Sequence, residues 1–266
     1  MSDEVKGYGW RPVVKADLGN YRPQSAKVMK GGLFVRAEIK SHMEKYGVKL
    51  SECQPSDVAA FESFADYLSR AFAEGARPVD TASNSLIAPC DGYITAHFIN
   101  SMGLIPVGNH MYSVRKLLGG DSRAKDFNEG MALILRLDEG DPHRFVYPDD
   151  GACGDRFTLA AEKDMEDSMF FSARSCTFMD MKHFFGMAQV ETCGNAKGVE
   201  QFAGDDSLVF VKGQEKGRFL CGGAGILMLF KKGMMFPDDE IMVNTREGLE
   251  TRVRQGEKIG IAIAVG

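Results

Sequence analysis

Residues 219–230 read Phe-Leu-Cys-Gly-Gly-Ala-Gly-Ile-Leu-Met-Leu-Phe, and they carry the clearest structural signal in this chain. The apolar run over residues 225–230 predicts a strand. A phosphate-binding loop is the alternative for Gly-Gly-Ala-Gly. It is disfavoured because no complete G-x-G-x-x-G or Walker pattern is present and no helix is predicted after the glycines. The stretch therefore predicts a strand that opens directly after Ala224.

Short apolar runs of the same kind recur after Pro78, broken by Gly, Asn and Asp. The predicted strands are residues 86–88, 93–99, 131–137, 209–211, 225–230 and 259–265. Their spacing is typical of mostly antiparallel strands in a barrel or sandwich, and no regular βαβ alternation is present. The Met- and Phe-rich run 178–185 predicts strand core and a hairpin. The alternative is an exposed loop around Phe184 that contacts a membrane or a partner.

Helices are predicted largely in the first third of the chain. Residues 1–24 show no periodicity and predict an irregular arm, whereas the apolar positions of residues 33–46 fit a helix. A second helix is predicted because apolar residues recur at intervals of three and four, with two cap candidates before them and a glycine after them. These residues are Phe61, Phe64, Leu68 and Phe72, with Ser56 and Asp57 as caps and Gly75 as the stop.

The predicted fold class is α+β, with a helical amino-terminal third packed on a mostly antiparallel β barrel or sandwich core. We expect an arm and helix in residues 1–56 and one larger structural unit in residues 57–266. No internal repeat, low-complexity tract or long linker divides the chain further.

Composition and charge exclude several function classes. A net charge of -5 and a pI near 5.6 give no general polyanion-binding signature, so nucleic acid is not an expected partner. The six cysteines form no C-x-x-C pair, which argues against a zinc module and a disulfide framework. We expect no metal, reduced thiols and a soluble cytoplasmic protein, because neither an apolar signal core nor a membrane-spanning run of about 20 apolar residues is found.

Four separated segments, in order and at suitable spacing, resemble the phosphatidylserine decarboxylase family from about Val58 to the end of the chain. Residues 61–80 (FESFADYLSRAFAEGARPVD) resemble the family's amino-terminal helix and Gly-Ala-Arg-Pro turn, and residues 86–92 (LIAPCDG) resemble its Ser-Pro-Ala-Asp-Gly motif. Residues 127–151 (FNEGMALILRLDEGDPHRFVYPDDG) resemble the strand that leads to Asp-Tyr-His-Arg-x-His-x-Pro-x-x-Gly. Residues 212–230, with 253–261, resemble the carboxy-terminal processing region.

The resemblance implies a decarboxylase proenzyme that makes its own covalent pyruvoyl group from a serine. The serine hydroxyl attacks the preceding carbonyl, the amide becomes an ester, and β-elimination frees a new amino terminus. Water then replaces its nitrogen, which leaves as ammonia, and the resulting ketone forms a Schiff base with the substrate amine before CO₂ leaves. The matching junction here is Gly223–Ala224. Alanine has no hydroxyl, so we expect this chain to remain uncleaved and inactive, whereas a serine-containing form would be a carboxy-lyase.

The same resemblance assigns roles to an acid and a histidine. Asp91 precedes a glycine, which by itself favours a turn aspartate, but the resemblance implies an acid that orients a histidine during serine activation. His143 matches the first histidine of the family motif and could act as acid or base near pH 7. Val146 stands where the family has its second histidine, and valine cannot accept a proton.

Other positions are weaker candidates or further departures. His110 is a possible substitute base, and Tyr112 and Arg144 are possible substrate-binding residues. Departures from the family pattern are Pro142 in place of tyrosine, Gly225 in place of threonine, and Ser172-Ala173-Arg174 in place of Asn-Glu-Arg. The remaining histidines, His42, His97 and His183, are interpreted as packing or surface residues.

Two classes of function stay open. The first is the decarboxylase precursor, acting on an amine-bearing carboxylic acid that is either phosphatidylserine or a soluble amino acid or conjugate. The alternative is a natural pseudoenzyme that keeps the fold as a binding module, because positions 224 and 146 are both altered. A carrier domain is a weaker option, since no lysine in a tight hairpin motif supports it. We expect a homo-oligomer, with peripheral membrane contact as an option.

Overall fold

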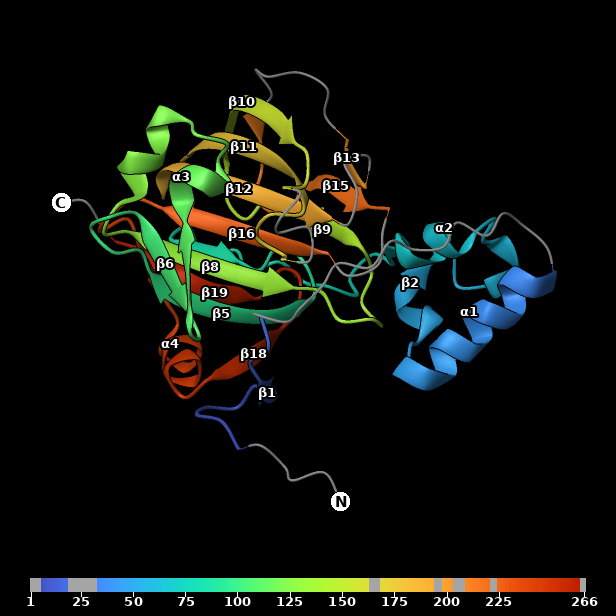
Figure 1. Cartoon of the computed structure of the whole chain (residues 1–266). Coiled ribbons are helices and arrows are strands. Elements are labelled where there is room, and N and C mark those ends of the chain that lie inside the picture. Colours follow the sequence, from blue (N-terminus) through green and yellow to red (C-terminus); the bar gives the residue numbers. More distant parts are fainter. Residues whose placement is uncertain are drawn as a thin grey trace.

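The computed structural model describes residues 6–18, 33–162, 168–193, 198–202, 209–220 and 224–263. Its main body is built on a nine-stranded antiparallel sheet (Figure 1). In spatial order the strands are β1 (Val13–Lys15), β18 (Leu249–Val253), β5 (Gly92–Phe98), β8 (Met131–Arg136), β16 (Gly225–Phe230), β12 (Phe185–Cys193), β11 (Ala173–Met181), β10 (Gly151–Leu159) and β14 (Val209–Phe210).

Smaller sheets and short helices cover this sheet. The three-stranded sheets are β13 (Val199–Gln201), β15 (Glu215–Phe219) and β9 (Arg144–Val146), and β17 (Met235–Pro237), β19 (Lys258–Ala262) and β4 (Ser85–Ile87). A hairpin joins β6 (Leu104–Val107) to β7 (His110–Ser113), and the body also holds α3 (Val114–Leu117), a 3₁₀ turn (Ser122–Phe127) and α4 (Asp239–Arg246).

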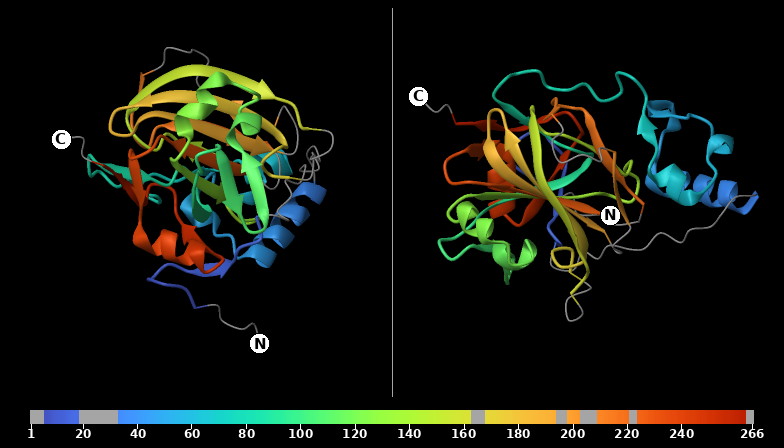
Figure 2. Two further views of the ribbon diagram at one scale, coloured as in Figure 1. Left: turned by 60° about the vertical axis from the view of Figure 1, so that its left-hand side comes forward. Right: turned by 90° about the horizontal axis from the view of Figure 1, so that it is seen from above.

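A small lobe, formed by residues 33–72, stands at one end of the body (Figures 1 and 2). It consists of α1 (Leu33–Tyr46), two 3₁₀ turns (Leu50–Glu52 and Val58–Ala60), α2 (Phe64–Leu68) and a hairpin of β2 (Cys53–Gln54) and β3 (Ala71–Phe72). The lobe has its own apolar core, in which Ile39 and Tyr67 are completely buried. It is therefore a separately packed layer rather than an extension of the sheet.

The predicted helix over residues 61–72 is largely wrong. Only Phe64–Leu68 is helical, and it begins where the Ser63 hydroxyl accepts a hydrogen bond from the Asp66 amide. The chain leaves the helix at Ser69 and then forms β3, which pairs with β2. Phe61, Phe64 and Leu68 pack in the lobe core, whereas Phe72 does not, and a helix is only one way to achieve such packing. Among the described residues of the first third, helix is thus limited to short stretches besides residues 33–46, where the predicted helix is confirmed.

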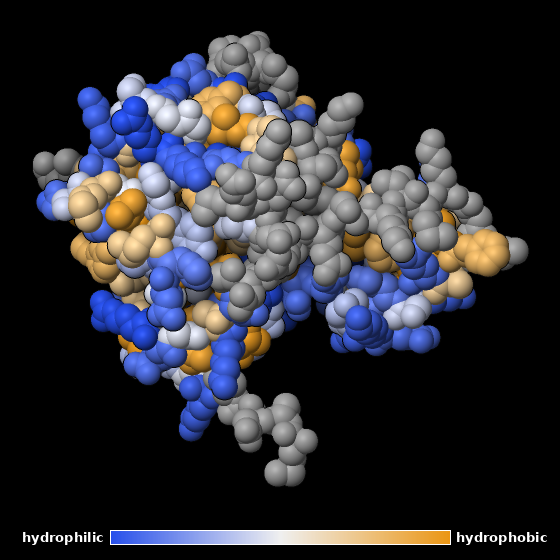
Figure 3. All heavy atoms as spheres, in the orientation of Figure 1, coloured by the Kyte–Doolittle hydropathy of each residue, from blue (hydrophilic) through white to orange (hydrophobic). Residues whose placement is uncertain are grey.

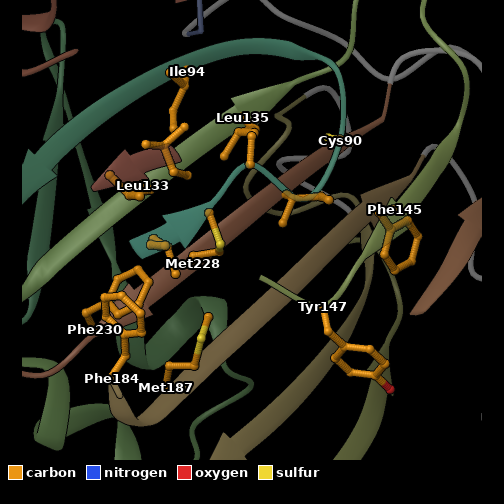
Figure 4. Close-up of a cluster of buried hydrophobic side chains, with 14 of the residues drawn as sticks. Cys90, Ile94, Leu133, Leu135, Phe145, Tyr147, Phe184, Met187, Met228 and Phe230 are labelled. Atoms are coloured by element: carbon orange, nitrogen blue, oxygen red, sulfur yellow. The ribbon is translucent and has the colours of Figure 1, made fainter. Parts of the chain in front are cut away.

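Both faces of the central strands β8 and β16 are buried, which explains their continuous apolar runs. On β16, Ile226, Met228 and Phe230 pack into one core cluster, and Leu227 and Leu229 pack into the other. Figure 4 shows the first cluster, where Met228 and Phe230 lie near Leu133, Phe184 and Met187. A strand that is covered on both sides has no polar face and therefore shows no alternation.

The predicted antiparallel strands are confirmed, but the sheet does not close into a barrel, because β1 and β14 are its two edges. The hairpin predicted in residues 178–185 joins β11 to β12. Phe184 at this turn is fully buried, so the exposed-loop alternative is wrong for that residue, although Phe185 is 46% exposed. On the face seen in Figure 3, hydrophobic side chains gather in small groups separated by hydrophilic ones.

Reduced thiols are found at most of the described cysteines, with one exception. Cys53, Cys90, Cys153 and Cys176 are free and buried. Cys193, at the end of β12, is disulfide-bonded, so the prediction of reduced thiols is wrong for this residue. Its neighbour Thr192 pairs with Gly225, which places Cys193 beside the start of β16.

Candidate functional site

Ala224 lies at the start of β16, in the middle of the large sheet. It is fully buried, and its carbonyl oxygen accepts a hydrogen bond from the Leu137 amide at 3.0 Å. The next residue, Gly225, pairs with Arg136 at the end of β8 and with Thr192 of β12. Both neighbouring strands therefore hold the backbone at this point. Gly223, the other half of the expected junction, lies outside the described residues.

Gly225 has no room for a side chain. A Cβ atom added there would collide with the Cε of Met169 and would come within 3.0 Å of the Leu135 carbonyl oxygen. The Met169 methyl group is the far end of a flexible side chain and can move, whereas the contact with the Leu135 backbone is tight. The departure from the family's threonine at this position thus matches the local packing.

The connection from β8 to β9 is held in place by an ion pair. The Asp141 carboxylate accepts a hydrogen bond from the Asp138 amide at 2.8 Å and is bound by both terminal nitrogens of Arg252 on β18. Burial raises the pKa of Asp141, and Arg252 opposes that rise. Asp138 directly follows Leu137, so this pair fixes the backbone that contacts Ala224.

His143 ends the same connection and is buried. Its amide donates to the Leu68 carbonyl at 2.8 Å, and its carbonyl accepts from the Phe219 amide at 2.7 Å. Leu68 is the last residue of α2, and Phe219 is the last residue of β15, the strand that precedes the expected junction. The backbone of His143 is therefore fixed by the lobe on one side and by the segment leading to position 224 on the other.

Asp91 is also buried and lies in an ion pair. Arg77 donates to it from Nε at 3.0 Å and from a terminal nitrogen at 2.7 Å, and the Gln255 amide donates at 2.8 Å. Arg77 in turn also pairs with Glu52 of the lobe. The role predicted for Asp91, to orient a histidine, stays a prediction; the partners described for its carboxylate are Arg77 and the Gln255 amide.

Val146 is buried within β9. Its amide donates to the Pro89 carbonyl at 2.9 Å, and its neighbours Phe145 and Tyr147 point into the core cluster of Figure 4. The site thus has an aliphatic side chain where the family motif has its second histidine.

The weaker candidates separate into two groups. Tyr112 of β7 stacks on Phe170 at a centroid distance of 3.8 Å, and Met169, next to Phe170, contacts Gly225. His110 is exposed, and its ring lies 6.0 Å from that of Tyr112. Tyr112 is therefore linked to the start of β16 through one packed layer, whereas His110 lies further out.

The two arginine candidates mainly support backbone. Arg144 donates to the Ser69 carbonyl at 2.8 Å and pairs with Glu215. Arg174, the residue that remains of the family's Asn-Glu-Arg, is buried and donates to the carbonyls of Lys116 and Leu117 at the end of α3. By donating to carbonyls that have no partner within the helix, Arg174 stabilises the end of α3.

The sequence did not single out the residues that join the lobe to the body. Arg70 donates to the Gly140 carbonyl at 2.5 Å, and Arg77 and Arg252 bind the two buried acids Asp91 and Asp141. Together with neighbours they line a pocket of about 250 Å³. Two of these residues lie in motifs that the sequence analysis quoted. Arg77 belongs to Gly-Ala-Arg-Pro, and Asp141 is the acid of Asp-Pro-His-Arg.

Among the described residues, no group of three or more His, Cys, Asp or Glu side chains is arranged to hold a metal ion. Within the same residues, none of the helices is long and apolar enough to cross a membrane.

Comparison with known proteins gives a consistent result. Residues 64–261 match the phosphatidylserine decarboxylase family. The phosphatidylserine decarboxylase proenzyme of Ruminiclostridium cellulolyticum is 33% identical over 238 residues, which cover 86% of this chain and 79% of that protein. The proenzyme of Clostridium perfringens strain ATCC 13124 is 28% identical over 235 residues (85% and 80%), and that of Clostridium botulinum strain Hall is 32% identical over 227 residues (82% and 76%).

Proposed function

Because this chain belongs to the phosphatidylserine decarboxylase family, a family of carboxy-lyases, we propose that it is the uncleaved precursor form of a decarboxylase whose reacting residue would be a serine at position 224. One observation carries the proposal. Residue 224 opens the central strand β16, with its carbonyl held by Leu137, and the connection that holds it ends at His143.

Proenzymes of this family are in general pyruvoyl-dependent, and the residue now at position 224 does not fit that group. The methyl side chain of Ala224 has no oxygen with which to attack a carbonyl. A serine there would supply the oxygen without a change of volume large enough to disturb the strand. When formed, the group supplies a ketone that accepts electrons as CO₂ leaves.

The chain's own residues would provide position and proton transfer. The Leu137 amide orients the carbonyl of residue 224, and the buried surroundings exclude water from it. His143, whose backbone is fixed at both ends, would take or return a proton through its imidazole. Arg252 and Asp141 would act indirectly, by holding the connection between these two residues.

The test is the variant Ala224→Ser, incubated and run on a denaturing gel. We expect a fragment that ends at residue 223 and one that begins at residue 224, with the second blocked to Edman sequencing. The parent chain is the control and should stay single. Adding His143→Ala should slow the cleavage. An Ala224→Ser chain that is folded and remains single counts against the proposal.

The second candidate, a pseudoenzyme, is favoured by one specific observation. Position 146 is buried, and Gly225 leaves little space for the family's threonine, which is consistent with surroundings that suit the altered residues. The variant that discriminates is Ala224→Ser with Val146→His. If this double variant folds and still does not cleave, the binding-module function takes first place.

Two substrate classes remain within the first candidate, phosphatidylserine and a soluble amino acid or conjugate. Flotation with phosphatidylserine vesicles separates them, because a lipid-directed enzyme should float with the vesicles. The homo-oligomer proposed from the sequence is tested by sedimentation velocity.

A further inference from the structure

A pocket lies where the lobe meets the body, beside the segment that holds residue 224. Its wall on the body side is formed by Asp138, Gly140, Asp141 and Pro142, which connect Leu137 to His143. The lobe supplies the facing wall, from the end of α1 to β3. At about 250 Å³, the pocket is smaller than the usual 300–1,000 Å³ of sites for larger ligands.

The pocket carries charges of both signs, and they balance. Four of its residues are basic and four are acidic; these are Lys49, Arg70, Arg77, Arg252, Glu52, Asp91, Asp138 and Asp141. Two acids are already neutralised, Asp91 by Arg77 and Asp141 by Arg252. An ion of one sign would therefore add an uncompensated charge, whereas a ligand with both signs would not.

Some of these groups still have unused hydrogen-bonding capacity. Within the part of the chain that the structure describes, no hydrogen bond reaches the carboxylate of Asp138 or the ammonium of Lys49. Arg252 uses its two terminal nitrogens on Asp141, which leaves further N–H donors, since a guanidinium has five. The acceptor and the donors thus line one pocket, with Lys49 on the lobe side and Asp138 and Arg252 on the body side.

Arg70 adds an independent observation at the same pocket. It is only 3% exposed and lines the pocket beside the Cys53 thiol, with which it interacts, yet no nitrogen or oxygen acceptor among the described residues lies against its Nε. Its terminal nitrogens are used on the carbonyls of Tyr67 and Gly140. A buried guanidinium N–H without an acceptor is costly, so such groups mark places where a ligand or ordered water completes the structure.

We propose that this pocket binds the ammonium and carboxylate groups of a small free α-amino acid, with Asp138 receiving the ammonium and Lys49 and Arg252 receiving the carboxylate. The inference rests on the proposed function, in which that amino acid would be the substrate. The pocket's size and its mainly polar lining leave no place for two acyl chains. A free α-amino acid and the serine headgroup of a phospholipid both carry an ammonium and a carboxylate group. The experiment below distinguishes these two sources.

Binding is measured by isothermal titration calorimetry on the full chain as it stands, with Ala224, so that no cleavage is needed. The probes are L-serine and then each other proteinogenic L-amino acid, up to about 10 mM. We expect at least one to bind, and its N-acetyl and amide derivatives to bind about tenfold more weakly, because each lacks one charge. Glycerophosphoserine and phosphatidylserine vesicles form the lipid arm and should bind no better than L-serine.

Variants locate the site. Asp138→Asn should weaken the amino acid about tenfold and leave the N-acetyl derivative unchanged, a difference that general damage to the fold would not produce. Lys49→Met should weaken the amino acid but not its amide. The matched controls are Glu139→Gln and Lys45→Met, exposed neighbours that do not line the pocket.

Three results would overturn the inference: no amino acid binds, only the lipid-derived probes bind, or Asp138→Asn has no effect. These outcomes are separate from cleavage of the Ala224→Ser chain. A chain that binds amino acids but never cleaves would reject the proposed function alone.

Discussion

Lys216 and Glu191 form an ion pair in which neither side chain reaches solvent. Lys216 Nζ donates to Glu191 Oε1 at 2.5 Å, and to Thr177 and Gln201 at 3.2 Å each. Burial lowers the pKa of Lys216, and Glu191 opposes that change. The pair ties β15, which leads to position 224, to β12, which pairs with β16. The pair stabilises the fold only because each buried charge neutralises the other.

Removing one member of this pair should therefore be far worse than removing both. We expect Lys216→Met to cost about 3–5 kcal/mol of unfolding free energy, because Glu191 is left buried and unpaired, and Glu191→Leu added to it to recover most of the loss. Urea denaturation measures the cycle. Lys232→Met, in an exposed pair with Glu129, is the control and should change stability by less than about 0.5 kcal/mol. Additive single and double variants would contradict the argument.

His42 makes the stability of the lobe depend on pH. Burial, aided by Arg70 and Lys45, lowers the pKa of His42 to about 4, and its Nδ1 lies 3.1 Å from the Tyr67 hydroxyl. The unfolded chain takes up this proton near pH 6.5, and the folded chain only near pH 4. The stability that the folded protein gains from keeping His42 neutral is therefore complete above pH 6.5. It is lost as the pH falls from 6.5 to about 4.

The variant His42→Leu should remove this part of the acid destabilisation. The parent should lose about 2 kcal/mol between pH 7 and pH 5 through His42 alone, a loss that the variant lacks. Urea midpoints at the two pH values measure it. Some loss should persist in the variant, since burial also lowers the pKa of His97 to about 4. Exposed His110→Leu is the control; if its pH dependence changes as much, the assignment is wrong.

At the scale of elements, the sequence predicted a segment well where one regular element buries its apolar residues, and poorly where several short elements do so. β16 lies between two strands and two core layers, so its six-residue apolar run admits one structure. Phe61 is instead buried in a lobe of short pieces and Phe72 is only half-buried, and their spacing matched a helix that ends at Ser69. Asp91 and His143 were singled out because the family motifs carry them, and their roles stay predictions. Arg252 was not, since its partner Asp141 lies 111 positions away.

The start of β16 also predicts how the strand responds to a side chain. Gly225→Thr, which restores the family residue, should destabilise the protein by about 1–3 kcal/mol because the new Cβ would meet Met169 and the Leu135 carbonyl. Met169→Ala opens part of that space. This substitution should therefore lower the unfolding free energy less in the Gly225→Thr background than in the parent. Thermal unfolding of the parent, the two single variants and the double variant measures this coupling. Equal costs in both backgrounds would show that Met169 is not the obstacle.

For the whole molecule, the sheet order predicts what cleavage before residue 224 would do. Three described strands that follow residue 224 pair with strands that precede it. β16 lies between β8 and β12, β18 lies between β1 and β5, and β19 pairs with β4 on one side and with β17 on the other. Removing the segment would expose the central core cluster. The backbone hydrogen bonds and apolar contacts that hold it do not depend on the bond before residue 224.

Cleaved Ala224→Ser protein should therefore elute as one species in native size exclusion and separate into two fragments only in denaturant. Co-expression of residues 1–223 and 224–266 as separate chains tests the same point without cleavage, and should yield a complex with the elution volume of the parent. Adding Leu227→Asp, which places a charge in a completely buried position of β16, should abolish that complex. Fragments that elute apart in native buffer would mean that the sheet depends on the intact chain.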